Sequence, residues 1–462
     1  MTSTTAPASR EERAPRPEPV SREERKVLAG TLVGTTIEWY DFFIFAQLSA
    51  TLLAALFLKP LEASNPALAG ILAFALVGIS FLFRPLGAII AGRVGDRIGR
   101  KPTLVATLIL MGVATAGIGF LPTYAQAGVI APVLLILLRI VQGFSAGGEW
   151  GGAALMAVEH APTGKRGLFG AYPQIGVPLG MILATGLLFG LRTSISPADF
   201  ASWGWRIPFV LSILLILVGY LIRRRVEDSP VFKELSERRA ESSAPLTELL
   251  KHHFKPVAQS ALIFIANNAA GYLVIAYFIS YSTKVLKMEP SPVIGMTALA
   301  SFSWLVFTLV GGSLSDRLGR VKTFLLGYAI VAVWIIPCFL LVETKSLGLY
   351  LLALVVLSAG LGLSYGPQSA MYAEMFPARI RYSGISIGYA IGAIFGGAFA
   401  PMISEALFVG THSSVSIGVY IIVLCVISVL GLLWAGETRG RDLSIDAADH
   451  HYVKGASGEQ VR

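Results

Sequence analysis

The chain has 462 residues, of which 54% are hydrophobic and only 14% charged, and its mean hydropathy is +0.68. A water-soluble protein of this length cannot bury so much apolar surface, so the composition excludes a soluble globular fold and predicts a membrane protein. The net charge of +9 does not indicate nucleic-acid binding, because the cations are concentrated in polar segments between apolar ones.

Twelve apolar segments follow a polar N-terminal tail, residues 1–26, which we expect to be disordered. Each segment is long enough to cross about 30 Å of hydrocarbon as a helix. Alternating strands of the kind that build membrane barrels are not evident in the sequence. We therefore predict an all-α membrane protein with transmembrane helices near residues 27–57, 67–92, 102–121, 127–158, 166–192, 203–223, 257–284, 291–314, 321–342, 346–374, 382–409 and 413–436.

The longest polar stretch between apolar segments divides the chain into two parts with six segments each. It predicts an N-terminal six-helix bundle at 27–223, a cytoplasmic linker at 224–255 and a C-terminal six-helix bundle at 256–436. Residues 437–462 form a predicted cytoplasmic C-tail.

The positive charges are distributed asymmetrically across the predicted membrane. If the N-terminal tail is cytoplasmic, most Lys and Arg residues lie on the cytoplasmic side, as the positive-inside rule requires. We therefore expect a multi-pass protein of the cell (inner or plasma) membrane with both termini in the cytoplasm. The opposite side receives Lys59, Arg192, Arg206, Lys284, Lys287 and Lys345.

Two charged loops occur twice, once in each half. Residues 92–101 and 312–321 share a frame of Gly, Asp, Arg, Gly and Arg, and the Glu, Pro and Arg of residues 159–166 recur at 374–381. Repeated loops in the same order indicate two structural repeats, which are typical of secondary transporters.

These repeated charges either only cap helix ends and enforce topology, or also form a cytoplasmic gate between the halves. We expect both roles. The predicted gate residues are Asp96, Arg97, Arg100, Glu159 and Arg166 in the first half and Asp316, Arg317, Arg320, Glu374 and Arg381 in the second.

Five ionisable residues lie well inside predicted spans: Glu38, Asp41, Arg84, Arg139 and Glu149. Such residues are costly in a bilayer unless they are paired or face water, so each is a functional candidate. A rise of about 1.5 Å per residue places Arg84 near the depth of Glu38 and Glu149, and lets Arg139 reach toward Asp41. A buried carboxylate with an arginine partner suits proton coupling. Asp41 with Arg139, Glu38 and Glu149 are therefore proton-coupling candidates, and the alternative is a static buried ion pair.

The sequence contains no pattern that predicts chemistry on a substrate. No nucleophile–base pair or set of metal ligands falls within the spans, so we expect no enzyme activity, no cofactor and no metal. The two cysteines, Cys338 and Cys425, lie inside apolar segments and suit packing.

Several motifs resemble the metabolite:proton symporter family of the major facilitator superfamily, and the likeness extends over about residues 27–440. Residues 92–101 are similar to the superfamily's loop 2–3 signature, and residues 139–143 to its span-4 arginine motif. The motifs similar to the narrower family are Glu-Trp-Tyr-Asp-Phe at 38–42, Phe-Arg-Pro-Leu-Gly at 83–87, Gly-Gly-Glu-Trp-Gly-Gly at 147–152, Trp-Gly-Trp-Arg-Ile-Pro-Phe at 203–209 and Tyr-Ser-Gly at 382–384.

The resemblance implies the major facilitator fold, in which two six-helix bundles related by a pseudo-twofold axis act as a monomer. It also implies import with protons, by alternating access, of a small organic acid such as shikimate, 2-oxoglutarate or citrate. The alternative substrate is a zwitterionic osmolyte, proline or betaine, and a further alternative is a membrane sensor without transport.

The same resemblance suggests substrate-binding positions. Gln174, Asn267, Asn268 and Tyr365 fall where related sugar porters line their pocket, but Asn and Tyr replace the porters' Gln pair and Trp, which disfavours a sugar. An acid would need a buried guanidinium, and Arg84 is the expected anchor.

Hydrogen bonds to the substrate are expected from Tyr40, Gln174, Asn267, Asn268, Tyr272, Tyr277, Tyr365 and Gln368. A zwitterion would instead favour an aromatic cage. Its expected members are Trp39, Tyr40, Tyr272 and Tyr277.

Overall fold

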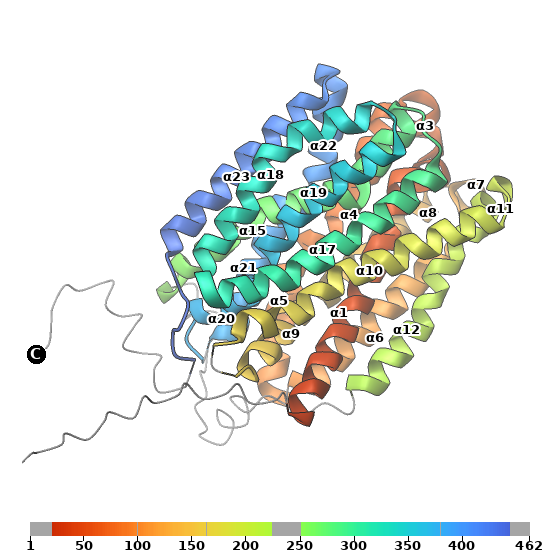
Figure 1. Ribbon diagram of the computed structural model, residues 1–462. Coiled ribbons are helices and arrows are strands. Elements are labelled where there is room, and N and C mark those ends of the chain that lie inside the picture. The colour runs from red at the N-terminus through yellow and green to blue at the C-terminus, as the bar shows by residue number, and fades with distance from the viewer. Residues whose placement is uncertain (1–20, 99, 163, 224–250, 379, 444–462) are drawn as a thin grey trace, which may run out of the picture.

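The computed structural model describes residues 21–443 except 99, 163, 224–250 and 379, and these described residues are helical throughout apart from their connections (Figure 1). The predicted linker therefore lies almost entirely outside the described residues, as does most of the predicted C-tail. Below, the first half means residues 21–223 and the second half means residues 251–443.

The first half contains fourteen short and long helices, in which η denotes a π- or 3₁₀-helix. They are α1 (Arg22–Leu48), η1 (Ser49–Leu53), α2 (Ala54–Phe57), α3 (Lys59–Ser64), α4 (Pro66–Leu82), α5 (Arg84–Ile98), α6 (Arg100–Phe120), α7 (Tyr124–Ala127), α8 (Ile130–Ala146), α9 (Glu149–Glu159), α10 (Arg166–Ser194), α11 (Pro197–Ser202), η2 (Gly204–Arg206) and α12 (Ile207–Arg223).

The second half follows the same pattern of long helices with local breaks. Its helices are α15 (Phe254–Tyr272), η3 (Leu273–Tyr277), α16 (Phe278–Ser280), η4 (Tyr281–Val285), α17 (Pro290–Leu318), α18 (Arg320–Glu343), α19 (Leu347–Tyr365), α20 (Gln368–Met375), α21 (Arg381–Ala393), η5 (Ile394–Ala398), α22 (Ala400–Thr411) and α23 (Ser414–Ala435).

The helices account for the predicted membrane spans. Among the described residues, ten helices are long and apolar enough to cross a bilayer, and the bent pair formed by residues 24–48 and 51–57 makes an eleventh if it is one span. The remaining predicted segment contains a shorter apolar helix, Val105–Phe120. Large apolar side chains on the outside, such as Val113, Leu214 and Val333, are exposed, as expected of a surface that faces lipid.

Several spans are interrupted by a turn, and the local sequence explains the three interruptions that precede the polar residues described below. Proline has no N–H for the helix ladder, and adjacent glycines are weak helix formers. Span Pro66–Ala91 breaks at Phe83, just before Arg84 and Pro85. The other two breaks are at Gly147 and Gly148 between α8 and α9, and at Gly366 and Pro367 between α19 and α20.

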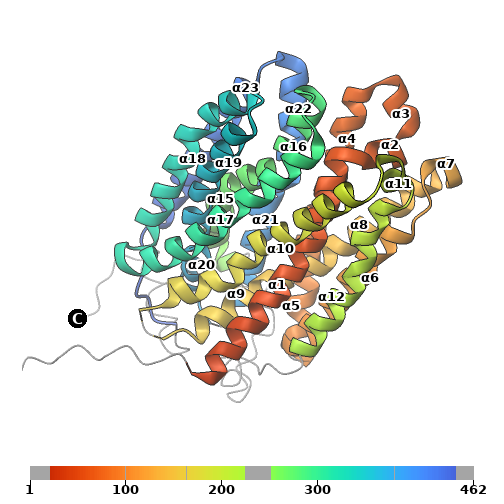
Figure 2. The same cartoon turned by 45° about the vertical axis from the view of Figure 1, so that its right-hand side comes forward.

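The two halves lie side by side (Figures 1 and 2). They meet where α10 packs along α17, where α4 and α5 contact α21, η5 and α22, and where α9 contacts α20 and α21. Helix α1 begins and α23 ends at the same end of the molecule (Figure 1). The predicted cytoplasmic position of the termini requires this common end.

Glycines in the first half allow helix backbones to touch. A Cβ added to Gly143 in α8 would lie 1.8 Å from the Ser80 carbonyl oxygen of α4, and one added to Gly87 in α5 would lie 1.8 Å from the Phe144 carbonyl oxygen. In contrast, a Cβ added to Gly186 in α10 would meet no atom within 4 Å. Small residues at close crossings are a recurrent feature of membrane helix packing.

This contrast generates a stability prediction. Gly143→Ala should separate α8 from α4 and cost about 1–3 kcal/mol, the usual range for overpacking, because the obstructing atom is backbone. Gly186→Ala should leave stability unchanged or raise it slightly, since alanine is the better helix former. Thermal unfolding in detergent measures both, and equal Tm values for the two variants would contradict the close packing.

Candidate functional site

The helix breaks place polar residues at the centre of the molecule. Arg84, Glu149 and Gln368 are the first residues of α5, α9 and α20, while Tyr272 and Tyr365 are the last of α15 and α19. All five are buried. Both halves therefore contribute polar side chains at helix ends near the middle of their spans.

Arg84 is a buried cation on aromatic faces. Its guanidinium carbon lies 4.3 Å from the ring centroid of Phe81, 4.4 Å from that of Phe42 and 5.6 Å from that of Trp39. Such contacts stabilise a desolvated cation without consuming its N–H groups. Among the described residues, Nε and Nη2 of Arg84 have no hydrogen-bond acceptor. The arrangement leaves N–H donors available for an anion.

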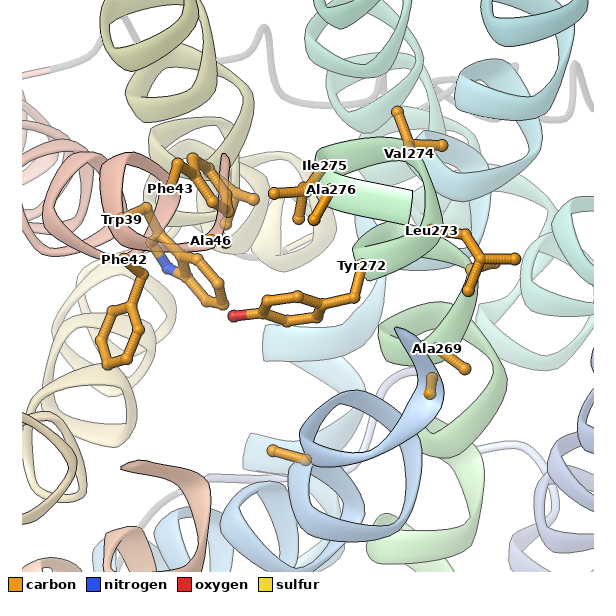
Figure 3. Close-up of a cluster of buried hydrophobic side chains, with 14 of the residues drawn as sticks. Trp39, Phe42, Phe43, Ala46, Ala269, Tyr272, Leu273, Val274, Ile275 and Ala276 are labelled. Atoms are coloured by element: carbon orange, nitrogen blue, oxygen red, sulfur yellow. The ribbon is translucent and has the colours of Figure 1, made fainter. Parts of the chain in front are cut away.

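Tyr272 approaches this site from the second half. Its ring meets Phe81 edge to face at a centroid distance of 5.3 Å, and its hydroxyl points toward Trp39 (Figure 3). The charges of Arg84 and Glu38 act on the Tyr272 hydroxyl. They also act on the hydroxyls of Tyr365 and Tyr389, so the basic and acidic groups share one site with tyrosines of the second half.

An aromatic stack forms the wall of this site. The Trp150 ring of the first half stacks on Tyr389 with a distance of 3.9 Å between ring centroids, and Tyr389 stacks on Phe264 with a centroid distance of 4.4 Å. Gln174 orients the stack, because its Oε1 accepts from Trp150 Nε1 at 2.8 Å and its amide donates to the Tyr365 carbonyl at 3.4 Å. Gln174 thus joins the halves at the wall of the site. Tyr389 and Trp150 were not among the predicted substrate-binding residues.

Four predicted substrate-binding side chains tie helices together instead of facing Arg84. Their polar hydrogens are committed to neighbouring helices: Tyr40 to the Pro208 carbonyl, Asn267 to Ser364 and the Leu361 carbonyl, Asn268 to the Ala393 carbonyl and Tyr277 to the Ser404 carbonyl. Two of these hydroxyls belong to Tyr40 and Tyr277, which were also predicted members of an aromatic cage for a zwitterion. The other two predicted members, Trp39 and Tyr272, lie close to each other (Figure 3).

Asp41 is buried in the first half with hydroxyl partners. It accepts from Ser212 at 2.6 Å and from Thr115 at 2.9 Å. Glu149 is a second acid within electrostatic range of Asp41. The hydroxyl donors come from α12 and α6, and no pattern in the sequence singles out these two residues.

The depth estimate suggested that Arg139 reaches Asp41, but the structure separates them. The guanidinium donates to Ser80 Oγ at 2.8 Å, to the Leu76 and Val77 carbonyls at 3.1 Å and to Gln142 Oε1 at 2.7 Å. No ion pair joins it to Asp41 among the residues described. Arg139 faces α4, whose carbonyl oxygens accept hydrogen bonds from its guanidinium.

A charge cluster joins the two halves at the end of the molecule where α23 ends. Arg381 donates to Glu159 of the other half at 3.3 Å. Arg320 binds Glu374 with two N–H···O bonds of 3.1 and 3.2 Å, and Arg166 of the first half approaches Glu374 at 3.9 Å. These contacts among predicted gate residues connect the halves.

Asp316 strengthens the same cluster. Its two carboxylate oxygens accept from the backbone N–H groups of Gly167 and Leu168 at 2.8 and 2.9 Å, at the first turn of α10. A carboxylate at a helix N-terminus is favoured by the helix dipole. The side chains of Asp96, Arg97 and Arg100 lie outside the described residues, and so does their predicted part in the gate. Arg317 contributes its carbonyl, which accepts from Arg439.

The segment after the last span belongs to this cluster, although the sequence suggested only a tail. Arg166 donates to the Arg441 carbonyl at 2.6 Å, Arg381 to the Leu443 carbonyl at 3.1 Å and Thr438 to Glu374 at 2.9 Å. Residues 437–443 therefore bind both halves. The alternating charges of Glu437-Thr-Arg-Gly-Arg, directly after α23, were the available signal.

Glu437 anchors that segment through backbone donors. The N–H groups of Arg320, Val321, Thr438 and Arg439 donate to its carboxylate at 2.9–3.2 Å. Partial burial raises the pKa of Glu437, but these four bonds outweigh burial and hold the pKa below its usual value. Among the described residues, no group of three His, Cys, Asp or Glu side chains is arranged to hold a metal.

The comparison with protein families decides the class of this fold. The model of the Major Facilitator Superfamily matches residues 31–401. The chain belongs to the major facilitator superfamily. It is a multi-pass membrane transporter of metabolites rather than an enzyme, and the match confirms the predicted all-α architecture.

Curated relatives and a solved structure extend this result. The inner membrane metabolite transport protein YhjE of Escherichia coli is 34% identical over 90% of this chain and 95% of its own. The shikimate transporter of Escherichia coli is 34% identical over 91% and 96%. A putative proline/betaine transporter of Staphylococcus haemolyticus is 32% identical over 88% and 86%. The proton:xylose symporter XylE superposes with a TM-score of 0.75 at 18% identity, covering 93% and 99%, which shows a common fold.

Within this transporter, the charge cluster should contribute strongly to stability. Glu374→Gln keeps the shape of the side chain but removes the charge that Arg320 requires. Removing one partner of a buried ion pair costs about 3–5 kcal/mol. Unfolding in detergent micelles should therefore show a large loss of stability for Glu374→Gln. Glu289→Gln, which changes an exposed acid, should lose almost no stability. A Glu374→Gln protein as stable as the wild type would contradict the assigned pairing.

Proposed function

We propose that the chain is a proton-coupled symporter that imports a small organic acid by alternating access, with the acid bound to Arg84. The observation that carries this proposal is the Arg84 guanidinium, which is buried between the halves with Nε and Nη2 lacking acceptors among the described residues. The shikimate transporter, a relative that aligns with 91% of this chain, is named for an acid, and its name supports an acid substrate.

The chemistry of the Arg84 site favours a carboxylate. A buried guanidinium is stabilised most by two parallel N–H···O bonds, and the two oxygens of a carboxylate are the acceptors for them. Tyr272 from the second half can then bind a hydroxyl or ring substituent of the same molecule. A substrate that contacts Arg84 and Tyr272 together would hold the two halves in a closed arrangement, as alternating access requires.

Proton coupling follows from the acids around this site. A carboxylate substrate brings another negative charge close to Glu38, Glu149 and Asp41. Like charges in a low dielectric favour uptake of a proton by one of the carboxyl groups. Asp41 is our first choice as the proton carrier because the hydroxyls of Ser212 and Thr115 bind its carboxylate inside the first half. Glu38 and Glu149 are the alternatives.

The charge cluster serves as the cytoplasmic gate in this proposal. Arg381 with Glu159, and Arg166 with Glu374, hold the halves together at one end. Opening toward that end requires these pairs to separate, which is a shift between two packings of the halves. The name of its relative YhjE supports a place in the inner membrane, and the charge distribution supports a cytoplasmic position of both termini; that the transporter acts as a monomer is part of the proposal.

A proline or betaine substrate is the second candidate, supported by the names of relatives. The geometry disfavours it. The faces of Trp39, Phe42 and Phe81 are already occupied by the Arg84 cation, which would repel a quaternary nitrogen. A sensor without transport would show no flux of any substrate under a gradient.

The anchor is tested by uptake of a labelled panel of shikimate, 2-oxoglutarate, citrate, protocatechuate, proline and betaine. Arg84→Gln should raise the KM of the transported acid by about tenfold to hundredfold, the effect of losing charged hydrogen bonds. Arg192→Gln is the matched control, because Arg192 also lies on an aromatic ring, Phe200 at 4.5 Å, away from the site. Uptake restricted to betaine or proline, with no effect of Arg84→Gln, would overturn the acid assignment.

The coupling residue is tested separately in proteoliposomes. Asp41→Asn cannot carry a proton, so it should exchange the acid across the membrane but fail to concentrate it under an inward proton gradient. Accumulation ratios for wild type and variant, measured with and without the gradient, provide the readout. If Asp41→Asn still concentrates substrate, the coupling role passes to Glu38 or Glu149.

A further inference from the structure

We infer that Thr115, fixed in place by Gln142, is a positioning residue that controls when Asp41 takes up and releases its proton. The inference rests on the proposed proton coupling through Asp41. Thr115 lies in α6, is fully buried and contacts three groups: Asp41, Gln142 and the Met111 carbonyl.

The direction of each bond follows from Arg139. A guanidinium has only donors, so the group of Gln142 that faces Arg139 at 2.7 Å must be its oxygen. The amide nitrogen of Gln142 must then face Thr115, 2.6 Å away, and donate to its oxygen. The chain of bonds from Arg139 thereby fixes one lone pair of the Thr115 hydroxyl as an acceptor.

The Thr115 hydroxyl hydrogen consequently has two possible acceptors. Asp41 Oδ2 lies 2.9 Å away and the Met111 carbonyl, one turn earlier in α6, lies 3.0 Å away. One hydrogen makes only one strong bond at a time. An ionised carboxylate is the stronger acceptor, so the hydroxyl points to Asp41 in that state.

Protonation of Asp41 reverses this choice without moving a heavy atom. A proton that arrives on Oδ2 creates an O–H group, which needs an acceptor, and the second lone pair of Thr115 supplies it. The Thr115 hydroxyl then turns to the Met111 carbonyl, while Gln142 continues to donate. Release of the proton restores the first arrangement, so protons and bonds balance in both directions. Ser212 donates to Oδ1 throughout.

Few other charges face Asp41. Helix α9 presents Glu149 to it, and α8 presents Arg139 only through Gln142. On its own helix the titratable neighbours are Glu38, one turn earlier, and Tyr40, whose hydroxyl is bound to the Pro208 carbonyl. The remaining contacts described for the carboxylate are hydroxyls of α6 and α12. Thr115 is therefore the link between the carboxylate and a fixed positive charge.

The other end of the chain of bonds lies at the surface between the halves. Arg139 binds the carbonyls of Leu76 and Val77 and the hydroxyl of Ser80, all in α4. Helix α4 contacts η5 and α22 of the second half. The hydroxyl at Thr115 thus connects the proton site to a helix that borders the moving interface.

The test observes the proton on Asp41 directly and needs no ligand. In the purified full-length protein, pH-difference infrared spectroscopy detects the C=O stretch of protonated carboxyl groups, and the band absent from Asp41→Asn belongs to Asp41. Thr115→Val removes the hydroxyl at nearly constant volume, whereas Thr115→Ser retains it. Thr308→Val is the matched control, because Thr308 is equally buried and donates only to the Trp304 carbonyl.

Loss of the hydroxyl removes a charged hydrogen bond from the ionised form but a weaker neutral one from the protonated form. The titration midpoint of the Asp41 band in Thr115→Val should therefore move by about one to two pH units to higher pH. Thr115→Ser should restore the wild-type midpoint, and Thr308→Val should not shift it. The pH profile of gradient-driven shikimate uptake by the same variants provides a second readout.

The outcomes distinguish the role of Thr115 from the proposed proton coupling through Asp41. If the Asp41 band titrates but its midpoint is equal in the wild type and Thr115→Val, the role of Thr115 is overturned while coupling through Asp41 stands. If no titrating band is lost in Asp41→Asn, Asp41 is not the proton site and both ideas fail. A shift in Thr115→Val that Thr115→Ser does not reverse would identify a packing effect and would overturn the inference.

Discussion

The burial of one guanidinium, that of Arg84, is the constraint on which the centre of this transporter depends. A cation in the middle of a membrane span is costly unless it is compensated. Here three aromatic rings provide the compensation, and they come from α1 and from the end of α4. Because rings stabilise the charge without accepting hydrogen bonds, the site can be desolvated and still retain donors for a substrate.

Broken helices bring this cation and its neighbours to one level. A helix break within a membrane is tolerated only where protein or a cavity satisfies the freed backbone groups, so breaks concentrate polar residues between the halves. Arg84, Glu149 and Gln368 each start a helix after such a break. The breaks before these residues occur at Phe83 before Pro85, at Gly147-Gly148 and at Gly366-Pro367. Local sequence thus determines where the proposed transport site is placed along each span.

Much of this organisation could be predicted from the sequence, because hydrophobicity and charge act along the chain. Apolar length identified the spans, and the five ionisable residues inside them were expected to be buried. Depth could be estimated from the helix rise, but the rotation of one helix against another could not. Asp41 therefore faces the hydroxyls of α6 and α12, and Arg139 faces the carbonyls of α4. Tyr40 points into the first half for the same reason.

The charge cluster shows a second limit on what the sequence predicts. The repeat identified its ion-pair residues, because the same charges occur twice in order. The docking of residues 437–443 depends on Arg166 and Arg381, which are distant in sequence, and a polar segment after the last span has no pattern that reveals such partners. Their contacts are backbone carbonyls, to which any residue type could contribute.

Two short helices connect the proposed transport site with the charge cluster. Helix α9 begins with Glu149 at the centre and ends with Glu159 in the charge cluster, and α20 begins with Gln368 and carries Glu374 near its other end. The two helices contact each other across the halves. Each also starts at a glycine-containing break, so a tilt of α9 or α20 as a rigid body must move its central residue and its acid in the charge cluster together.

Asp41, Thr115 and Ser212 all belong to the first half, so a proton bound there, as proposed, cannot by itself separate ion pairs that join the halves. It must change the relative energy of the two packings through an element that crosses between them. Helix α9, which presents Glu149 to Asp41 and Glu159 to Arg381, satisfies this requirement within a single helix.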